Sequence, residues 1–229
     1  MFNKTNIELV TGFLDCGKTT FINSLLSKTL ITSEKIVILL FENGEGKIDE
    51  KYSLDSNIAI EYFPPTKEIN FKLLNYFRRK YHPNRIIIEF NGSRDLNELL
   101  PMVNSKDFKR VFKIKEIVNI IDSKLFPIYL NNMGSIITSP IKHGNIILIN
   151  NKSKVSYENL NNIKKTIKLL NRKTYIIDFE SVSNLNSKMK KSSLFYKDFF
   201  TILQILTKDS KEIQRWYLII LWLFLLGYY

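Results

Sequence analysis

The chain has 229 residues, of which 45% are apolar, and this proportion excludes intrinsic disorder as its main state. The 34 lysines and arginines against 22 acidic residues give a formal charge of +12. This charge favours an anionic partner such as a nucleotide, a nucleic acid or an acidic lipid, without choosing among them. The single cysteine, Cys16, excludes an internal disulfide framework and a cysteine-rich zinc site.

Short β-branched runs alternate with stretches whose apolar residues recur at spacings of three and four, which predicts alternating strands and helices. We expect strands at residues 7–11, 35–41, 58–63, 85–90, 115–121, 146–150 and 174–179. We expect helices at residues 18–29, 68–81, 96–103 and 157–170. Several strands are apolar throughout, which is typical of a sheet covered on both faces. The pattern therefore predicts an α/β fold of three layers with a mainly parallel sheet.

The domain organisation follows from changes in composition. Residues 1–180 carry the alternating pattern, residues 181–193 are polar and lysine-rich and predict a linker, and residues 194–229 predict an apolar helical tail. The apolar run at 7–13 is too short for a cleaved leader and continues into a glycine loop, so we expect a cytoplasmic protein.

The tail ends in fourteen uncharged residues, WYLIILWLFLLGYY at 216–229. As a helix they would span about 21 Å, against a hydrocarbon core of about 30 Å. Aromatic rings at both ends are typical of a membrane interface. Two interpretations stay open: burial or a homodimer contact, and association of residues 213–229 with the cytoplasmic face of a membrane or with a membrane-protein partner.

The strongest motif is GFLDCGKT at 12–19, which fits G-x-x-x-x-G-K-[ST] between an expected strand and an expected helix. Such a P-loop curls its backbone amides around a phosphate at a helix N-terminus. Lys18 would neutralise the β- and γ-phosphates, and the Thr19 hydroxyl would bind Mg²⁺. The fold class is therefore predicted to be a P-loop NTPase. The expected nucleotide contacts in this loop are Gly12, Leu14, Asp15, Cys16, Gly17, Lys18, Thr19 and Thr20.

Two residues inside the loop need an explanation. Asp15 would repel a triphosphate unless its carboxylate points outward or forms a hydrogen bond within the loop. Cys16 is expected to fill the loop, and a low-pKa redox role at a helix N-terminus is the alternative.

Carboxylates follow two other expected strands. Glu89 ends a buried strand at the sheet edge where ligands of open α/β folds bind, so it could hold Mg²⁺, and Gly92 would let its amide approach the γ-phosphate. The alternative for Glu89 is a helix-capping or ion-paired carboxylate. Glu42, Glu45 and Asp49 lie in a loop that fits either a nucleotide-sensing switch or a solvated acidic loop.

These segments resemble the CobW-type P-loop GTPases, relatives of HypB and UreG. The resemblance covers roughly residues 5–178 and rests on GFLDCGKTTFINSLL at 12–26, on the apolar strand ending in E-x-x-G at 86–92, and on residues 41–49. The last segment matches N-E-x-G-E-x-G-[IV]-D at Glu42, Gly44, Glu45, Ile48 and Asp49. The resemblance implies a slow GTPase switch linked to metal handling or to a metal-related partner. In it Lys18, Glu42 and Glu89 would be catalytic, with Thr19 and Glu89 on Mg²⁺.

The chain also departs from this family. The C-x-C-C metal motif is missing from residues 60–66, and His82 and His143 are too isolated to rebuild such a site. Only about fifty residues follow the last expected strand, so we do not expect the family's second domain.

The guanine-reading motif N-K-x-D is incomplete. Asn151 and Lys152 are retained as expected nucleotide contacts, but Lys154 replaces the Asp and would present donors to the guanine donors. We expect GTP as the nucleotide, with ATP as the alternative. Asp122 is expected to be structural, as a helix cap.

Two further functions compete with the GTPase switch. One is a degenerate nucleotide-binding adaptor with little or no turnover, held on a membrane or membrane-protein partner by its tail. The other, nucleic-acid binding, is disfavoured because aromatic residues are not interleaved with basic ones in a stacking pattern.

Overall fold

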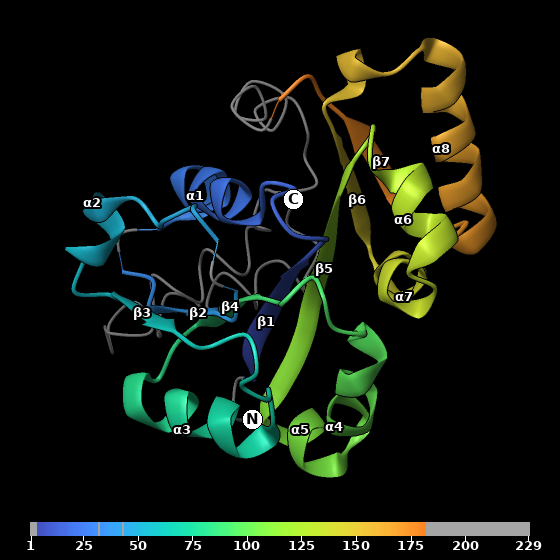
Figure 1. Cartoon of the computed structure of the whole chain (residues 1–229). Helices are drawn as coiled ribbons and strands as arrows, with labels where there is room; N and C mark the ends of the chain where they lie inside the picture. Colours follow the sequence, from blue (N-terminus) through green and yellow to red (C-terminus); the bar gives the residue numbers. More distant parts are fainter. Residues whose placement is uncertain (1–3, 32, 43, 182–229) are drawn as a thin grey trace, which may run out of the picture.

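The computed structural model describes residues 4–31, 33–42 and 44–181 (Figure 1). The strands are β1 (Thr5–Thr11), β2 (Ile36–Leu40), β3 (Ile58–Tyr62), β4 (Arg85–Glu89), β5 (Phe112–Asp122), β6 (Ile146–Asn150) and β7 (Tyr175–Asp178). The α-helices are α1 (Lys18–Thr29), α2 (Glu50–Ser53), α3 (Phe71–Tyr81), α4 (Leu100–Asn104), α5 (Lys106–Val111), α6 (Phe126–Asn132), α7 (Ser135–His143) and α8 (Tyr157–Leu170). Two 3₁₀ turns are η1 (Leu96–Leu99) and η2 (Lys152–Lys154).

The strands form one sheet in the order β3-β2-β4-β1-β5-β6-β7, and every neighbouring pair is parallel. The central strand β1 lies between β4 and β5, with Val10 in register with Glu89 on one side and Val118 on the other. Parallel strands bring all their carboxyl ends to one edge, so the residues that follow β1, β2, β4, β5 and β6 meet there.

Helices cover both faces of the sheet. Successive residues of a strand point to opposite faces, and here the apolar residues on each face pack against helices. Ile36 and Ile38 of β2 pack with α1 and α2, whereas Val37 and Leu39 pack with α3 and α5. Helices α6, α7 and α8 pack on the same face as α3, against β6. These layers confirm the predicted α/β P-loop NTPase sandwich.

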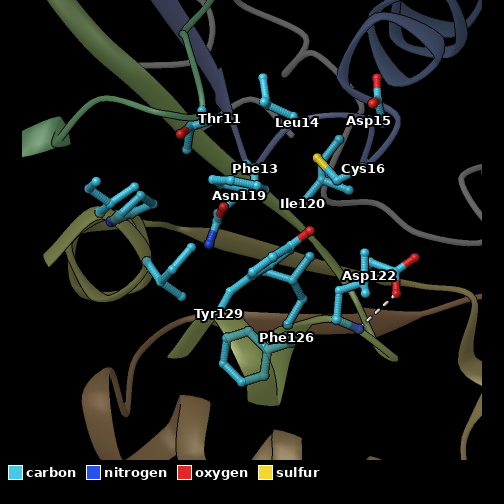
Figure 2. A pocket seen from close by; sticks show the side chains of 17 residues that line it. Thr11, Phe13, Leu14, Asp15, Cys16, Asn119, Ile120, Asp122, Phe126 and Tyr129 are labelled. Atoms are coloured by element: carbon cyan, nitrogen blue, oxygen red, sulfur yellow. Dashed lines mark hydrogen bonds between the residues drawn. The ribbon is translucent and has the colours of Figure 1, made fainter. Parts of the chain in front are cut away.

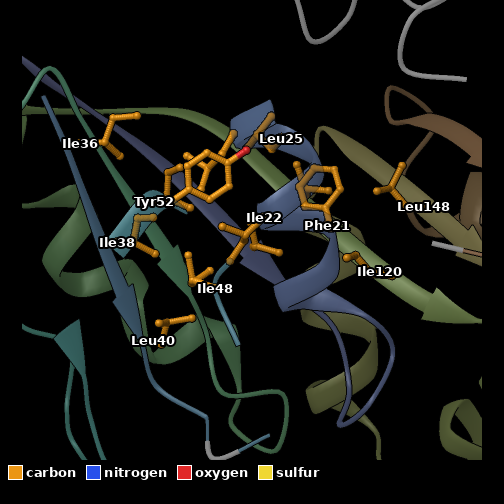
Figure 3. Packing of buried hydrophobic residues seen from close by; sticks show 14 of the residues in the cluster. Phe21, Ile22, Leu25, Ile36, Ile38, Leu40, Ile48, Tyr52, Ile120 and Leu148 are labelled. Carbon is orange, nitrogen blue, oxygen red and sulfur yellow. The ribbon is translucent and has the colours of Figure 1, made fainter. Parts of the chain in front are cut away.

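Helix α1 supplies much of the core beneath the site. Its Phe21, Ile22 and Leu26 are fully buried against the sheet, and Figure 3 shows Phe21 and Ile22 among the strand side chains. Since α1 starts at Lys18, this packing holds the helix N-terminus at the carboxyl edge of β1.

The expected boundaries of α1, β6 and α8 are confirmed, and other boundaries differ. Helix α3 starts at Phe71 rather than at residue 68, because the side chain of Asn70 caps it by accepting from the Leu73 amide. The helix expected at 96–103 divides into η1 and α4, and β5 starts three residues before the expected strand at 115–121.

Four short helices, α2, α5, α6 and α7, were not expected. Two of them contain proline, at position 127 near the start of α6 and at Pro140 inside α7. Proline interrupts the apolar periodicity that predicts a helix, although it is compatible with a first turn.

The remaining expectations on organisation fall at the end of the chain. Residues 182–193 of the expected linker and the expected tail at 194–229 lie outside the described residues. Among the residues that are described, no helix is both long and apolar enough to cross a membrane.

Candidate functional site

The phosphate-loop motif occupies the turn between β1 and α1, where two glycines are required. Gly12 has φ 140°, and a Cβ there would lie 2.2 Å from the carbonyl oxygen of Ile120. Gly17 precedes the first helical residue with φ 102°. Neither conformation suits a residue with a side chain, so the glycine positions of the motif follow from the backbone path.

The Lys18 ammonium is enclosed by acceptors at the mouth of this loop. Its Nζ lies 2.8 Å from the carbonyl oxygen of Gly12 and 2.9 Å from that of Phe13. It also forms an ion pair with Glu42 Oε2 at 2.9 Å, in which the two side chains are only 2% and 6% exposed. The segment after β2 is therefore in direct contact with the P-loop through one charge pair.

Glu42 also contacts the turn after β4. The Gly92 amide donates to the same oxygen, Glu42 Oε2, at 3.1 Å. A Cβ on Gly92 would lie 2.1 Å from the Gly12 carbonyl oxygen, so only glycine allows this turn to approach the P-loop so closely. Gly12, Lys18, Glu42 and Gly92, all expected from the sequence, lie together.

Thr19 and Glu89 form the second half of the site. The Thr19 hydroxyl lies 3.1 Å from each carboxylate oxygen of Glu89, which is buried at the end of β4. Burial raises the pKa of Glu89 to about 7, and the negative charge of Glu42 adds to the rise, while Lys18 and the Thr19 hydroxyl oppose it. Glu89 therefore contacts the side-chain hydroxyl of a residue in the first turn of α1.

This pair suits a divalent cation, because hydroxyl and carboxylate oxygens are the hard donors that Mg²⁺ prefers. The raised pKa of Glu89 means that the Lys18 charge only partly offsets burial, and a bound cation would favour the ionised carboxylate further. The described residues contain no cluster of three or more His, Cys, Asp or Glu able to hold a metal ion. Mg²⁺ is usually held by one or two protein side chains together with phosphate oxygens and water.

The acidic segment after β2 is attached to α1. Asn23 Nδ2 donates to the Lys47 carbonyl at 2.9 Å, and Asn23 Oδ1 accepts from the Asp49 amide at 3.0 Å. Gly46 packs so closely that a Cβ there would lie 3.0 Å from Thr19 Cβ. Sequence reasoning missed Asn23, although its position one helical turn after Thr19 places it on the same side of α1.

The acidic residues of this segment differ in their environment. Glu45 and Asp49 are exposed, as in a solvated loop, whereas Glu42 faces Lys18. Ile48 between them is buried in the core.

The other loop residues have separate environments. Leu14, Asp15 and Thr20 are exposed, so the Asp15 carboxylate is in solvent as its charge requires. Cys16 is buried, and this burial raises the pKa of its thiol to about 12. The alternative of a low-pKa redox cysteine is therefore wrong, because a helix N-terminus cannot ionise a desolvated thiol here.

On the far side from α1, aromatic residues support the loop. The ring centroids of Phe13 and Tyr129 are 4.3 Å apart, and Figure 2 shows both rings beside Asn119 and Phe126. These residues line a cavity of about 70 Å³ between the P-loop and helices α6 and α7.

The end of β6 contacts the P-loop through a residue that was not expected in the site. Asn150 Nδ2 donates to the Cys16 carbonyl at 3.2 Å, whereas the side chain of Asn151 donates to Asp122. Asp122 also accepts from the amides of Lys124 at 2.9 Å and Leu125 at 3.1 Å, so its role is structural as expected. It closes the turn before α6 and does not cap that helix, whose N-cap is Leu125 without a side-chain bond.

Lys152 and Lys154, both in the turn η2, have different surroundings. Lys152 Nζ lies 3.3 Å from Glu180 and 3.6 Å from Asp178, and the hydrogen bond that Lys152 donates to Glu180 is the largest cause that raises the pKa of Lys152. Lys154 is exposed at the end of the turn. The structure thus brings Lys152 toward one carboxylate at the end of β7 and another just after that strand, neither of which belongs to the motif.

Comparison with known proteins agrees with this geometry. The sequence model of a family described as CobW/HypB/UreG, nucleotide-binding domain, matches residues 6–178. The zinc chaperone YeiR of Escherichia coli (strain K12) is 28% identical over 127 residues, which is 53% of this chain and 38% of YeiR. The chain therefore matches well under half of that relative's length.

Solved structures share the fold. The Zn(II)-bound YjiA GTPase from E. coli superposes with a TM-score of 0.57 and 18% identity, covering 77% of this chain and 57% of that chain. The hydrogenase maturation factor HypB from Archaeoglobus fulgidus gives a TM-score of 0.53 and 15% identity, covering 82% of this chain and 89% of that one.

Proposed function

Since the chain belongs to the CobW/HypB/UreG family of nucleotide-binding domains, we propose that it is a slow GTPase switch linked to metal handling or to a metal-related partner protein. The observation that supports this most is the convergence of Lys18, Thr19 and Glu89 at the carboxyl edge of β1. A lysine, a hydroxyl and a carboxylate in this arrangement are the parts that phosphoryl transfer from a nucleotide requires.

Lys18 would release the carbonyls of Gly12 and Phe13 and contact the β- and γ-phosphate oxygens. The N-terminus of α1 adds a partial positive charge to the same place. The further phosphate contacts proposed in the loop are Leu14, Asp15, Cys16, Gly17 and Thr20.

Thr19 and Glu89 would hold Mg²⁺, which when bound neutralises charge on the phosphate oxygens. Glu89 must be ionised for this role. Because burial raises its pKa, the fraction of Glu89 that is ionised depends on the positive charge nearby, which lowers that pKa. Glu42 and Glu89 are the proposed positioning groups for the attacking water, and catalysis would come from orientation and electrostatics.

GTP is the proposed nucleotide, on the strength of the family, with Asn151 and Lys152 at the base. ATP is the alternative, because Lys154 cannot accept from guanine. Metal handling is inferred from relatives: YeiR is named a zinc chaperone, and the YjiA structure contains Zn(II). Residues 60–66 contain no cysteine, so we propose that metal is handled through a partner protein.

A second candidate function is a degenerate nucleotide-binding adaptor with little or no turnover, held on a membrane or on a membrane-protein partner by its tail. Lys154 and the apolar residues 213–229 favour it. In this proposal a cytoplasmic protein is held by its tail, and deleting residues 213–229 would move it from the membrane fraction to the soluble fraction while nucleotide binding is kept. A homodimer contact is the separate proposal for the same tail.

The experiment that tests the main proposal compares GTP and ATP side by side, with Mg²⁺, for binding by calorimetry and for phosphate release. Tight GTP binding with slow release supports the GTPase switch. Binding with no release supports the adaptor, and no binding of either nucleotide contradicts both.

A further inference from the structure

Glu42 uses one carboxylate oxygen to contact two donors from different parts of the chain. Oε2 lies 2.9 Å from the Lys18 ammonium and 3.1 Å from the Gly92 amide nitrogen. The donors come from the start of α1 and from the turn after β4. An anionic oxygen is thus held between the P-loop and that turn.

A nucleoside triphosphate would need both donors for its terminal phosphate. Under the function proposed above, on which this inference rests, Lys18 contacts the γ-phosphate and the Gly92 amide approaches it. A diphosphate ends one group earlier and does not need the Gly92 amide. We infer that Glu42 sets the preference between di- and triphosphate, because its carboxylate occupies the position of the terminal phosphate.

The competition follows from charge and burial. Both side chains of the Lys18–Glu42 pair are almost fully buried, so their attraction is screened little by solvent. A terminal phosphate and the Glu42 carboxylate are both anions and cannot share one amide hydrogen. Triphosphate binding must therefore displace Glu42 and loses the free energy of its two charge-assisted bonds.

The displacement is bounded, because the backbone is held at Phe41 before Glu42 and again at Lys47 and Asp49. The Phe41 amide donates to the Glu89 carbonyl at 3.1 Å, and the Phe41 ring stacks on Phe63 at 4.8 Å. Farther along, Asn23 holds the backbone of Lys47 and Asp49. The terminal phosphate would thus move the Glu42 side chain between two anchored points and free it to orient water.

The test measures the affinities of GDP and of a non-hydrolysable GTP analogue, both with Mg²⁺, by calorimetry. Glu42→Gln removes the charge, and Glu42→Asp keeps the charge but shortens the reach. Glu45→Gln is the matched control, since it makes the same charge change at an exposed position of the same segment. We expect both Glu42 variants to shift the affinity ratio toward the triphosphate by about tenfold, since bonds to charged groups are the strong ones.

The outcomes separate this inference from the function on which it rests. An unchanged ratio in both Glu42 variants, with both nucleotides still bound, overturns the inference and leaves the proposed function standing. An equal shift of the affinity ratio in Glu45→Gln also overturns the inference, because the shift would then come from the change in net charge of the segment and not from the position of Glu42. If wild type binds neither nucleotide, both fail. Thermal melting checks folding, and if Glu42→Gln does not fold, Glu42→Asp decides.

Discussion

The side-chain amide of Asn150, the last residue of β6, donates to the backbone carbonyl of Cys16, 134 residues earlier in the chain, at 3.2 Å. This bond connects the P-loop to the strand that precedes the expected base-binding turn. It lies beside a cysteine that is itself buried, so the carbonyl has little access to water. The shape of the phosphate loop therefore depends on a residue outside the motif.

Replacing Asn150 by alanine should loosen the P-loop. The Cys16 carbonyl would lose its partner, which costs about 1 to 3 kcal/mol for a buried polar group. We expect lower stability in urea and weaker GDP binding by calorimetry. Asn162→Ala, at an exposed position of α8, is the control and should change neither quantity. Equal behaviour of the two variants would contradict the role of Asn150.

Lys18→Ala should abolish binding of Mg²⁺-nucleotide, because it removes the charge that meets the β- and γ-phosphates. It should also lower the free energy of unfolding by about 3 to 5 kcal/mol, since Glu42 would remain buried without its partner. The double variant Lys18→Ala/Glu42→Gln should recover most of this stability without recovering binding.

Lys28→Ala is the control for that series, as an exposed lysine in the last turn of the same helix. Nucleotide binding by Lys18→Ala at wild-type affinity would show that the loop does not bind phosphate. A double variant no more stable than the single one would show that the Glu42 charge is already compensated.

Glu89 should make stability depend on pH. Its pKa rises from 4.5 in the unfolded chain to about 7 in the fold, through burial first and the Glu42 charge next, against Lys18 and Thr19. Between these values the folded state binds more protons than the unfolded state, so stability falls as pH rises from about 4.5 to about 7. The contribution amounts to roughly 2 to 4 kcal/mol, because each pKa unit is worth about 1.4 kcal/mol.

The measurement is urea unfolding at several pH values, without nucleotide or divalent cation. Glu89→Gln should flatten the fall between pH 5 and 7, whereas Glu45→Gln, at an exposed site, should leave it unchanged. A Glu89→Gln profile parallel to that of wild type would show that Glu89 ionises at its ordinary pKa.

Lys154→Asp should sharpen the preference for GTP over ATP. The new carboxylate would offer two acceptors to guanine, worth about 1.5 to 3 kcal/mol, or roughly 10- to 100-fold in the affinity ratio. Lys165→Asp makes the same charge change at an exposed position of α8 and should have no effect. An unchanged ratio in Lys154→Asp would show that residues 151–154 do not contact the base.

The part of the site formed by residues that are close together in the sequence could be predicted from it. The run from Gly12 through α1 combines a motif with helical periodicity, and its boundaries were correct. Glu42, Glu89 and Gly92 could be placed near Lys18 because parallel strands end at one edge of a sheet. Their hydrogen bonds could not be predicted, because side-chain pairing depends on distances that periodicity does not contain.

The missed residues share a physical cause. Asn150 and Asn23 act on backbone groups, and any polar residue type can form such bonds at the right place, so neither has a sequence signature. The short helices α6 and α7 were missed because proline interrupts their pattern, and tertiary packing against β6 stabilises them instead.

The buried thiol of Cys16 can report on the opening of the P-loop. It is the sole cysteine in 229 residues, it is 3% exposed, and its pKa is raised to about 12. A thiol-specific reagent needs an exposed thiolate, so it can label the native protein only during excursions in which this loop opens. The labelling rate therefore reports how often the loop opens. Any ligand that holds the loop closed will lower this rate, so the native thiol can report on binding without an engineered probe.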